Sequence, residues 1–243
     1  MNRPDPDRLE PLRRIARLVP GGMALGQRLR RWTDPELREV ARLQTDEADQ
    51  VLQPFPDTYE ERYPELFDAL AAHLAALPAP QILSFGCSSG AEVRALQRRL
   101  PQARIVGLDL NRRALAQAEA IDPAGEYRLA GAPQAGERFD AILAMAVLRH
   151  GQLEADRPEQ CAQVMPFARF AEAAAMLDSA LKPQGWLAIG HAHFRLRDWS
   201  GANRYQADDT AFPGLSDPEL LYGADDCRIE QPGQIAVLHQ KLA

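Results

Sequence analysis

The sequence contains little cysteine and lysine and no long hydrophobic run. Its three cysteines, Cys87, Cys161 and Cys227, have spacings that fit neither a disulfide framework nor a zinc site. The longest apolar stretches, such as residues 141–148, have the length of a strand and are too short to cross a bilayer. Prolines and charges interrupt residues 1–20, so we expect no signal peptide. These absences predict a cytoplasmic protein with no membrane span and no bound metal.

The composition is that of a folded protein, but the charge is unevenly distributed. Of the 243 residues, 46% are hydrophobic and 26% are charged. The net charge is -6 at pH 7, although residues 1–42 hold ten arginines against six acidic residues. This basic arm can contact nucleic acid, anionic lipid or an acidic partner, or it can be the solvated surface of a helical cap, which we favour. The chain is acidic overall and lacks a further basic stripe with interleaved aromatic residues, which argues against a nucleic-acid partner.

The sequence pattern divides the chain after residue 57. Apolar residues before this point recur at helical spacing, and the segment from Thr33 to Glu36 resembles a helix cap. We therefore interpret residues 1–57 as an N-terminal helical cap or arm. Residues 58–243 are expected to form a single α/β domain.

From residue 81 onward, short apolar strands alternate with helices. Such alternation requires right-handed crossovers and a doubly wound, mostly parallel sheet. We expect a Rossmann-like α/β fold with seven strands, an antiparallel C-terminal edge strand and the N-terminal helical cap. Six of the seven strands can be assigned to residues 81–86, 104–109, 127–130, 139–144, 186–191 and 234–241. The predicted helices are residues 63–77, 91–100, 112–120 and 167–181.

Ligands of such sheets bind beyond the carboxyl ends of the strands, where two features of this sequence meet. The first strand runs into the turn Gly86-Cys87-Ser88-Ser89-Gly90, which a helix follows at once. The second strand ends in Asp109, about twenty residues further on, where a carboxylate can accept both hydroxyls of a ribose. Asp109 can alternatively cap the helix that begins near Asn111. We favour ribose binding.

The glycine turn disfavours NAD as the ligand. The dinucleotide fingerprint needs three glycines spaced G-x-G-x-x-G, so that the pyrophosphate can lie on the helix N-terminus. This chain has Ser88 at the second glycine position, and Gly90 comes one residue too early for the third. A nucleoside ligand without pyrophosphate, such as S-adenosylmethionine, fits the turn better.

Three separated stretches resemble the class I S-adenosylmethionine-dependent methyltransferases, and within them the chemotaxis receptor glutamate methyltransferases (CheR-type). The first is Thr58-Tyr59-Glu60-Glu61-Arg62, which is similar to the family's T-x-F-F-R segment. The second is Gly86-Cys87-Ser88-Ser89-Gly90-Ala91-Glu92, similar to its C-S-T-G-E-E turn. The third runs from Leu181-Lys182-Pro183-Gln184-Gly185 through Gly190-His191-Ala192-His193, similar to L-K-P-G-G…G-H-S-E. The likeness spans roughly residues 58–194.

The resemblance implies roles for individual residues. Arg62 would pair with the carboxylate of the methionine half of the cofactor, because a guanidinium fork suits two oxygens. Glu92 would accept from the cofactor's ammonium group, and Asp109 keeps its ribose role. The cofactor-binding residues are then expected to be Thr58, Arg62, Gly86, Cys87, Ser88, Gly90, Glu92, Asp109, Leu110, Asn111, Met145 and Ala146.

The candidate catalytic residues are three histidines. His150 follows the fourth predicted strand, where it can act as a base or orient the acceptor. His191 and His193 close the fifth predicted strand, and strand alternation would send both to one face, where they can bind substrate. A third ligand with convincing spacing does not follow them, so we do not expect a metal.

These features predict an S-adenosylmethionine-dependent methyltransferase acting on an unidentified small-molecule or protein side-chain acceptor, with transfer to oxygen favoured. The alternative is a module that binds S-adenosylmethionine or S-adenosylhomocysteine without transfer, as a sensor or partner subunit. The segment Ala130-Gly131-Ala132 favours this alternative, because it offers no polar side chain to the adenine amine. A third possibility, which the glycine spacing disfavours, is an enzyme that uses the nucleotide pocket for another ligand. The sequence does not define the oligomeric state.

Overall fold

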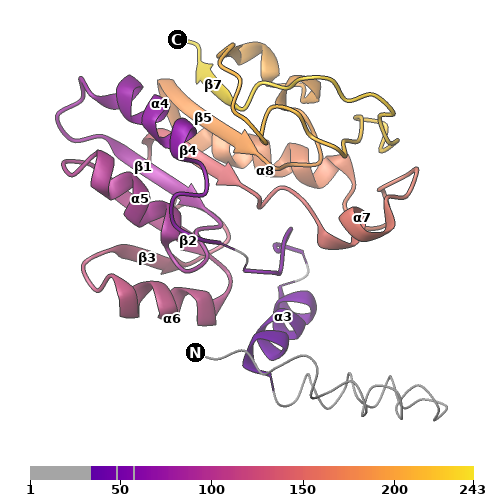
Figure 1. Ribbon diagram of the computed structural model, residues 1–243, viewed down its shortest axis with the longest axis horizontal. Coiled ribbons are helices and arrows are strands. Elements are labelled where there is room, and N and C mark those ends of the chain that lie inside the picture. The colour runs from indigo at the N-terminus through magenta and orange to yellow at the C-terminus, as the bar shows by residue number, and fades with distance from the viewer. Residues whose placement is uncertain (1–33, 48, 57) are drawn as a thin grey trace.

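A computed structural model describes residues 34–243 of the chain apart from residues 48 and 57 (Figure 1). The helices expected within residues 1–33 lie outside this range, so the described part of the cap begins with α3. None of the helices in the described part of the chain is long and apolar enough to cross a membrane.

Helix α3 (Pro35–Asp46) begins where the cap signal predicts. The carboxylate of Asp34 accepts a hydrogen bond from the backbone N–H of Glu36 at 2.9 Å, and Pro35 occupies the first turn. The helix is attached to the α/β domain through Arg42, whose Nη2 donates to the carbonyl oxygen of Leu110 at 2.8 Å. This contact places the N-terminal segment beside the end of the second strand.

The seven strands form one sheet in the order β3-β2-β1-β4-β5-β7-β6, so the mostly parallel, seven-stranded prediction is confirmed. Strands β1 to β5 pair in parallel, and β7 is antiparallel to both of its neighbours. The strand order reverses between β1 and β4, which makes their carboxyl ends the switch point. The strands are β1 (Gln81–Phe85), β2 (Arg104–Asp109), β3 (Glu126–Leu129), β4 (Phe139–Met145), β5 (Leu181–Gly190), β6 (Tyr205–Ala207) and β7 (Leu238–Lys241).

Helices cover both faces of the sheet, and side-chain alternation divides the core between them. Ile82 of β1 packs in the cluster that includes residues of α4 and α5, whereas its neighbour Leu83 packs in the cluster that includes residues of α8. Figure 1 shows these helices on their respective sides of the sheet. The helices of the α/β domain are α4 (Pro64–Leu74), α5 (Ala91–Arg99), α6 (Arg112–Ile121), α7 (Gly151–Asp156) and α8 (Phe167–Ala180).

The sheet departs from the sequence prediction at its C-terminal side. The last strand is antiparallel as expected, but β6 pairs with its outer side, so β6 and not β7 lies at the edge. Strand β6 was not predicted, because its three residues, Tyr205–Ala207, are too few to show the alternating pattern of a strand. The strand predicted over residues 186–191 begins earlier, because β5 starts at Leu181, which pairs with Phe139, and the ladder resumes only at Trp186.

Asp178 on α8 connects this helix to the two strands at that side. Its Oδ1 accepts from the Tyr205 hydroxyl at 2.8 Å and lies 3.1 Å from Nζ of Lys241. Its Oδ2 lies 2.9 Å from a guanidinium nitrogen of Arg204. The carboxylate is buried, which makes it dependent on these partners.

We expect Asp178→Asn to lower the free energy of unfolding by about 2–3 kcal/mol, because it leaves buried donors without their charged acceptor. The matched control is Asp68→Asn, since Asp68 is paired with Arg99 but its side chain is 68% exposed. The control should change stability by less than about 1 kcal/mol. Urea denaturation of both variants measures the difference, and an equal effect of the two would contradict this role for Asp178.

Candidate functional site

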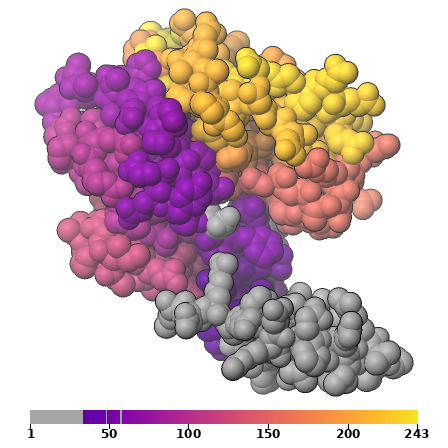
Figure 2. Space-filling model, in the orientation of Figure 1, coloured from indigo at the N-terminus to yellow at the C-terminus, as the bar shows by residue number. Residues whose placement is uncertain are grey.

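A cavity opens at the switch point, beyond the carboxyl ends of β1, β2 and β4. It contains about 930 Å³ of space including its open mouth, within the range of small-molecule sites. Its walls come from the turn after β1, the end of β2, the segment after β4 and the residues that precede α4. In Figure 2 the indigo part of the chain, which supplies the last of these walls, lies against the pink α6 region and the orange C-terminal region.

Nearly all residues predicted to bind a cofactor line this cavity. The lining includes Thr58, Arg62, Gly86, Cys87, Ser88, Glu92, Asp109, Leu110, Asn111, Met145 and Ala146. Gly90 is the exception among the described residues, since it forms the N-cap of α5 with a φ of 75° and does not line the cavity. A Cβ atom on Gly90 would lie 2.6 Å from the Tyr127 hydroxyl, so the position requires glycine.

The turn after β1 brings its backbone close to the end of β2. The N–H groups of Gly86 and Cys87 both donate to the carbonyl oxygen of Leu108, at 2.8 and 2.9 Å. Gly86 has a φ of 75°, and a Cβ there would lie 2.7 Å from the Val147 side chain. The turn is therefore packed between two strand ends and leaves no room for a side chain at Gly86.

Asp109 joins the two halves of this arrangement. Its Oδ2 accepts from the N–H of Ser88 at 2.7 Å, and its Oδ1 accepts from the N–H of Asn111 at 2.7 Å. Burial raises the pKa of this carboxyl above its usual value, while these backbone donors oppose the rise. Asp109 does not cap α6, because the side chain of Asn111 does so, accepting from the N–H of Ala114 at 2.9 Å.

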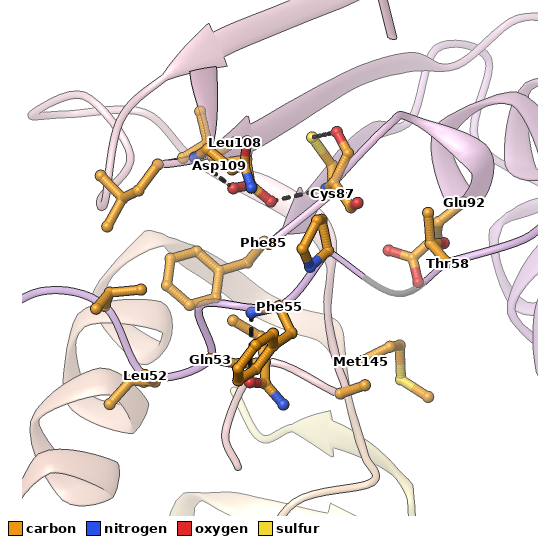
Figure 3. A pocket seen from close by; sticks show the side chains of 18 of the residues that line it. Leu52, Gln53, Phe55, Thr58, Phe85, Cys87, Glu92, Leu108, Asp109 and Met145 are labelled. Carbon is orange, nitrogen blue, oxygen red and sulfur yellow. Dashed lines mark hydrogen bonds between the residues drawn. The ribbon is translucent and has the colours of Figure 1, made fainter. Parts of the chain in front are cut away.

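Glu92 is a second carboxylate in the cavity wall. Its Oε1 accepts from the Ser84 hydroxyl at 2.6 Å. Burial raises the pKa of Glu92 to about 7, and the Ser84 hydroxyl and the Arg62 charge counter part of that rise. Figure 3 shows Glu92 beside Thr58, with Cys87 between this pair and Asp109 in that view. The cavity thus has two acidic ends.

Two hydroxyl groups in the wall have no hydrogen-bond partner among the described residues. They belong to Tyr63 and Ser88, and both oxygens are buried. A buried polar group without a partner costs free energy, so such groups are commonly satisfied by a ligand or ordered water. The guanidinium of Arg62 lies over the Tyr63 ring, 5.3 Å from its centroid. The hydroxyl groups of Tyr63 and Ser88 are therefore polar contacts in the cavity wall that the described residues do not themselves use.

An ion-pair network fixes the loop that carries Thr58 and Arg62. Glu60 contacts Arg94 at 2.7 Å and Arg98 at 3.1 Å, while Glu61 contacts Arg98 and Arg99 at 2.8 and 2.7 Å. The pKa of Glu61 is lowered to about 2, chiefly by its hydrogen bonds from Arg99 and Arg98. These contacts attach the loop to α5, a role that the sequence alone did not indicate for the two glutamates.

The sequence also failed to predict the cover of the cavity, which is formed by residues 50–56. These residues have no periodicity, so the only signal was their position before Thr58. Arg169 on α8 holds it in place, because its Nη2 donates to the carbonyl oxygens of Asp49 and Val51 at 3.0 and 3.1 Å. A Cβ at Gly131 would lie 2.6 Å from Oε1 of Gln50, so the Gln50 amide lies against Gly131 in the cavity wall.

The structure places the three candidate catalytic histidines in different surroundings, and none of them lines the cavity. His150 forms the N-cap of α7, where its Nδ1 accepts from the N–H of Gln152 at 3.2 Å. His193 is 1% exposed, and its Nε2 lies 3.2 Å from the carbonyl oxygen of His150. Neither is among the described residues that line the cavity. Their placement makes capping and core packing the roles that the contacts support.

The ring of His191 lies beside a residue that lines the cavity, although His191 itself is not in the lining. Its ring centroid is 5.6 Å from that of Tyr63, which lines the cavity. Strand β5 ends at Gly190, and His191 has a φ of 48°, so the expected strand alternation of His191 and His193 is wrong. Burial lowers the pKa of His191, and the charges of Arg62 and Arg149 lower it further. Among the described residues, no group of three or more His, Cys, Asp or Glu side chains is arranged to hold a metal.

Comparison with known proteins identifies a domain in the central part of the chain. Residues 82–185 match the family model described as a methyltransferase domain. The match is to this general domain, and no comparison supports the CheR-type assignment. No curated protein matches the chain by sequence.

Several solved structures are similar to part of the chain at low sequence identity. The plantazolicin methyltransferase BpumL, solved in complex with SAH, is 16% identical, with a TM-score of 0.41 and coverage of 66% of this chain and 55% of BpumL. DesVI of Streptomyces venezuelae is 17% identical, with a TM-score of 0.38 and coverage of 61% and 59%. The ribosomal protein L11 methylase of Lactobacillus delbrueckii subsp. bulgaricus is 14% identical, with a TM-score of 0.44 and coverage of 74% and 79%. This chain therefore spans little more than half the length of the first two proteins.

The raised pKa of Glu92 predicts a pH-dependent loss of stability. A carboxyl whose pKa is about 7 in the folded state and 4.5 in the unfolded state binds more protons when folded between those pH values. Stability contributed by the protonated form is therefore lost as the pH rises through this window. We expect Glu92→Gln to raise the free energy of unfolding by about 1–2 kcal/mol at pH 8 and to leave it nearly unchanged at pH 5.

Urea denaturation of the ligand-free protein at both pH values measures this effect. The control is Glu172→Gln, because Glu172 is exposed on α8, and it should alter stability by less than about 0.5 kcal/mol. A Glu92→Gln variant that is less stable than the wild type at pH 8 would show that the ionised carboxylate is compensated in the folded protein.

Proposed function

We propose that this chain, in which residues 82–185 match a methyltransferase domain, is an S-adenosylmethionine-dependent methyltransferase. The observation that supports this most strongly is a single cavity at the switch point that combines Asp109, Glu92 and Arg62. Each of these side chains suits a different part of one ligand, namely two hydroxyls, an ammonium and a carboxylate. The favoured acceptor atom is an oxygen of a small molecule or protein side chain.

The residues present fit this cofactor. Asp109 retains acceptor capacity beyond its two backbone donors and would hold the ribose hydroxyls, with Leu110 and Asn111 beside the adenine. Glu92 would accept from the ammonium group, and Arg62 would pair with the carboxylate. The buried hydroxyl of Ser88, which has no partner among the described residues, lies in the same wall and supports ligand binding there.

The position of Gln50 favours an active methyltransferase over a binding module that has lost its contact with the adenine. The sequence provides no polar side chain at residues 130–132, but the Oε1 atom of Gln50 lies against Gly131. An amide can both accept from and donate to an adenine edge. The N-terminal segment would thus supply the contact that the domain itself lacks, and the binding module without transfer becomes the second candidate.

When bound, S-adenosylmethionine supplies a methyl group on a sulfonium, which an acceptor attacks in line. The protein then has to position the acceptor and, for a hydroxyl, to remove its proton. His191 suits proton removal, because its lowered pKa keeps the imidazole neutral at pH 7. Met145 and Ala146, at the end of β4, would border the reacting centre. His150 and His193 would have structural roles, His150 as the N-cap of α7 and His193 in the core.

We expect wild-type protein to bind S-adenosylhomocysteine, and Asp109→Asn and Arg62→Gln each to weaken binding by about 1–3 kcal/mol through the loss of charge-assisted hydrogen bonds. Calorimetric titration measures the affinities. Asp68→Asn and Arg104→Gln are matched controls on exposed ion pairs and should bind as the wild type does. Absence of binding by the wild type would remove the basis of the methyltransferase proposal.

Turnover distinguishes the enzyme from a binding module. An active enzyme forms S-adenosylhomocysteine at a rate that depends on the added acceptor, which an assay with a panel of hydroxylated acceptors detects. A binding module would bind the cofactor with the same dependence on Asp109 and Arg62 but would show no acceptor-dependent product with any compound.

Cofactor affinity should depend on pH through Glu92. An ionised carboxylate is needed to pair with the ammonium group, and the pKa of Glu92 is about 7. We therefore expect the affinity for S-adenosylhomocysteine to rise as the pH increases from 5.5 to 7.5. Glu92→Gln should bind more weakly and lose this dependence, which calorimetry in matched buffers tests. An unchanged pH profile in the variant would assign the titration to another group.

A further inference from the structure

Two exposed aromatic rings lie in the wall of the cavity. In the described part of the chain, six large apolar side chains are exposed, and the aromatic ones among them are Phe55 and Tyr59, at 49% and 62%. Both line the cavity. An exposed ring is stabilised when a second apolar surface covers it, so two such rings at one cavity indicate a binding surface for an apolar group.

Packing within the chain uses only part of each ring. A Cβ atom on Gly151, the first residue of α7, would lie 3.6 Å from the Phe55 ring, so one side of this ring borders α7. The guanidinium of Arg62 lies 5.7 Å from the centroid of the Tyr59 ring. These contacts position the two rings, and the remaining exposed area of each is accessible to a ligand.

The lining provides no charged side chain for an acceptor beyond those assigned to the cofactor. The described residues of the lining include three charged ones, Arg62, Glu92 and Asp109, and the proposed function assigns all three to the cofactor. An anionic acceptor would therefore lack a cationic partner, since Arg62 is the only cation of this set. A cationic acceptor would compete for Glu92 with the ammonium group of the cofactor. Because an unpaired charge is costly to bury, the lining favours a neutral acceptor.

The proposed function leaves one polar group of the same wall unassigned. The hydroxyl of Tyr63 is buried and has no hydrogen-bond partner among the described residues. Tyr63 is 7% exposed, and its ring packs against Phe67 with 6.0 Å between centroids, which explains the place of the ring but not of the hydroxyl. Burial raises the pKa of this hydroxyl, so it stays protonated and can donate to an oxygen atom of a ligand.

Tyr63 and the exposed rings lie toward the methionine end of the proposed cofactor site. The guanidinium of Arg62 lies 5.3 Å from the ring centroid of Tyr63 and 5.7 Å from that of Tyr59, so both tyrosines flank the residue that would hold the cofactor carboxylate. Figure 3 shows Phe55 on the opposite side of the cavity from Asp109, the residue assigned to the ribose. The reactive methyl group belongs to the methionine half, so an acceptor has to approach this end.

We propose that Phe55, Tyr59 and Tyr63 form the acceptor subsite of the proposed methyltransferase, and that this subsite takes a neutral aromatic acceptor with a ring hydroxyl, a phenol. Phe55 and Tyr59 pack on the phenol ring, and the Tyr63 hydroxyl donates to the phenol oxygen. Transfer joins this oxygen to the methyl carbon, leaves the electron pair of the broken bond on sulfur, and releases the phenol proton, which the proposed function assigns to His191. The inference rests on the proposed function, because it names the substrate class of the same cavity.

Calorimetric titration at pH 7 of the protein saturated with S-adenosylhomocysteine tests this with four probes. The neutral phenol is 4-hydroxybenzamide, and each other probe changes one property: benzamide lacks the hydroxyl, 4-hydroxybenzoate carries a negative charge, and trans-4-hydroxycyclohexanecarboxamide lacks the aromatic ring. We expect the phenol to bind at least about fivefold more tightly than each of the others. Comparison with N-acetyltyrosinamide distinguishes a small free phenol from a tyrosine side chain as the source of the ring.

Substitutions separate the contributions of the hydroxyl and of the rings. Tyr63→Phe removes only the hydroxyl, so it should make the affinities for 4-hydroxybenzamide and benzamide equal. Phe55→Leu and Tyr59→Leu keep an apolar side chain but remove a ring, so each should reduce the preference over the saturated analogue to about twofold or less. Tyr127→Phe and Leu129→Ala are matched controls at residues outside the lining and should leave all affinities unchanged.

S-adenosylhomocysteine alone is titrated first into each protein. If the wild type fails to bind it, the proposed function fails. If the wild type binds it but binds none of the probes, binds the phenol and the saturated analogue equally, or prefers the benzoate, only the acceptor subsite is overturned. A Tyr63→Phe variant that loses affinity for S-adenosylhomocysteine but still prefers 4-hydroxybenzamide over benzamide would assign the hydroxyl to the cofactor and overturn its role in the subsite.

Discussion

The arrangement of the site depends on the carboxylate of Asp109 and the two backbone N–H groups that it accepts from, those of Ser88 and Asn111. One of these lies in the turn after β1 and the other at the start of α6, so a single side chain sets the distance between two strand ends. The loop it stabilises also presents the carbonyl oxygen of Leu110 to Arg42 on α3. The cavity wall, the start of α6 and the N-terminal segment with α3 are therefore all positioned through Asp109.

Much of the fold could be predicted because its physical causes are local in sequence. Residues 104–109 were predicted as a strand with these limits, since a short apolar run ends there in an acidic residue before a cap. Gly86 and Asp109 could be assigned to the cavity because parallel strands of a doubly wound sheet end at one edge. Strand β6 could not be predicted, because its three residues are ordered by Asp178 and β7 rather than by their own pattern.

The parts of the site that escaped prediction depend on contacts between distant residues. Gln50 lies in a stretch without periodicity and is brought to Gly131 by tertiary packing alone. The three histidines looked alike in sequence, and a left-handed φ of 48° at His191 is what separates it from His193. In the sequence, Glu60 and Glu61 are an ordinary pair of charged residues. Only the structure shows that they form ion pairs with arginines of α5. Sequence pattern identifies the strand ends, but it does not identify the loops that meet there.

The contacts of Arg169 with Asp49 and Val51 also constrain when the cavity can be completed during synthesis. The bonds join residues 120 and 118 positions apart, so the cover emerges from the ribosome long before the side chain that fastens it. At about 5–20 residues per second, the delay is roughly 6–24 s. During that interval the β1–β2 half can form its strands and turn with the site still open above them. The cover segment gains these two hydrogen bonds only after α8 has been made, so the cavity is completed well after its own cover has been synthesised.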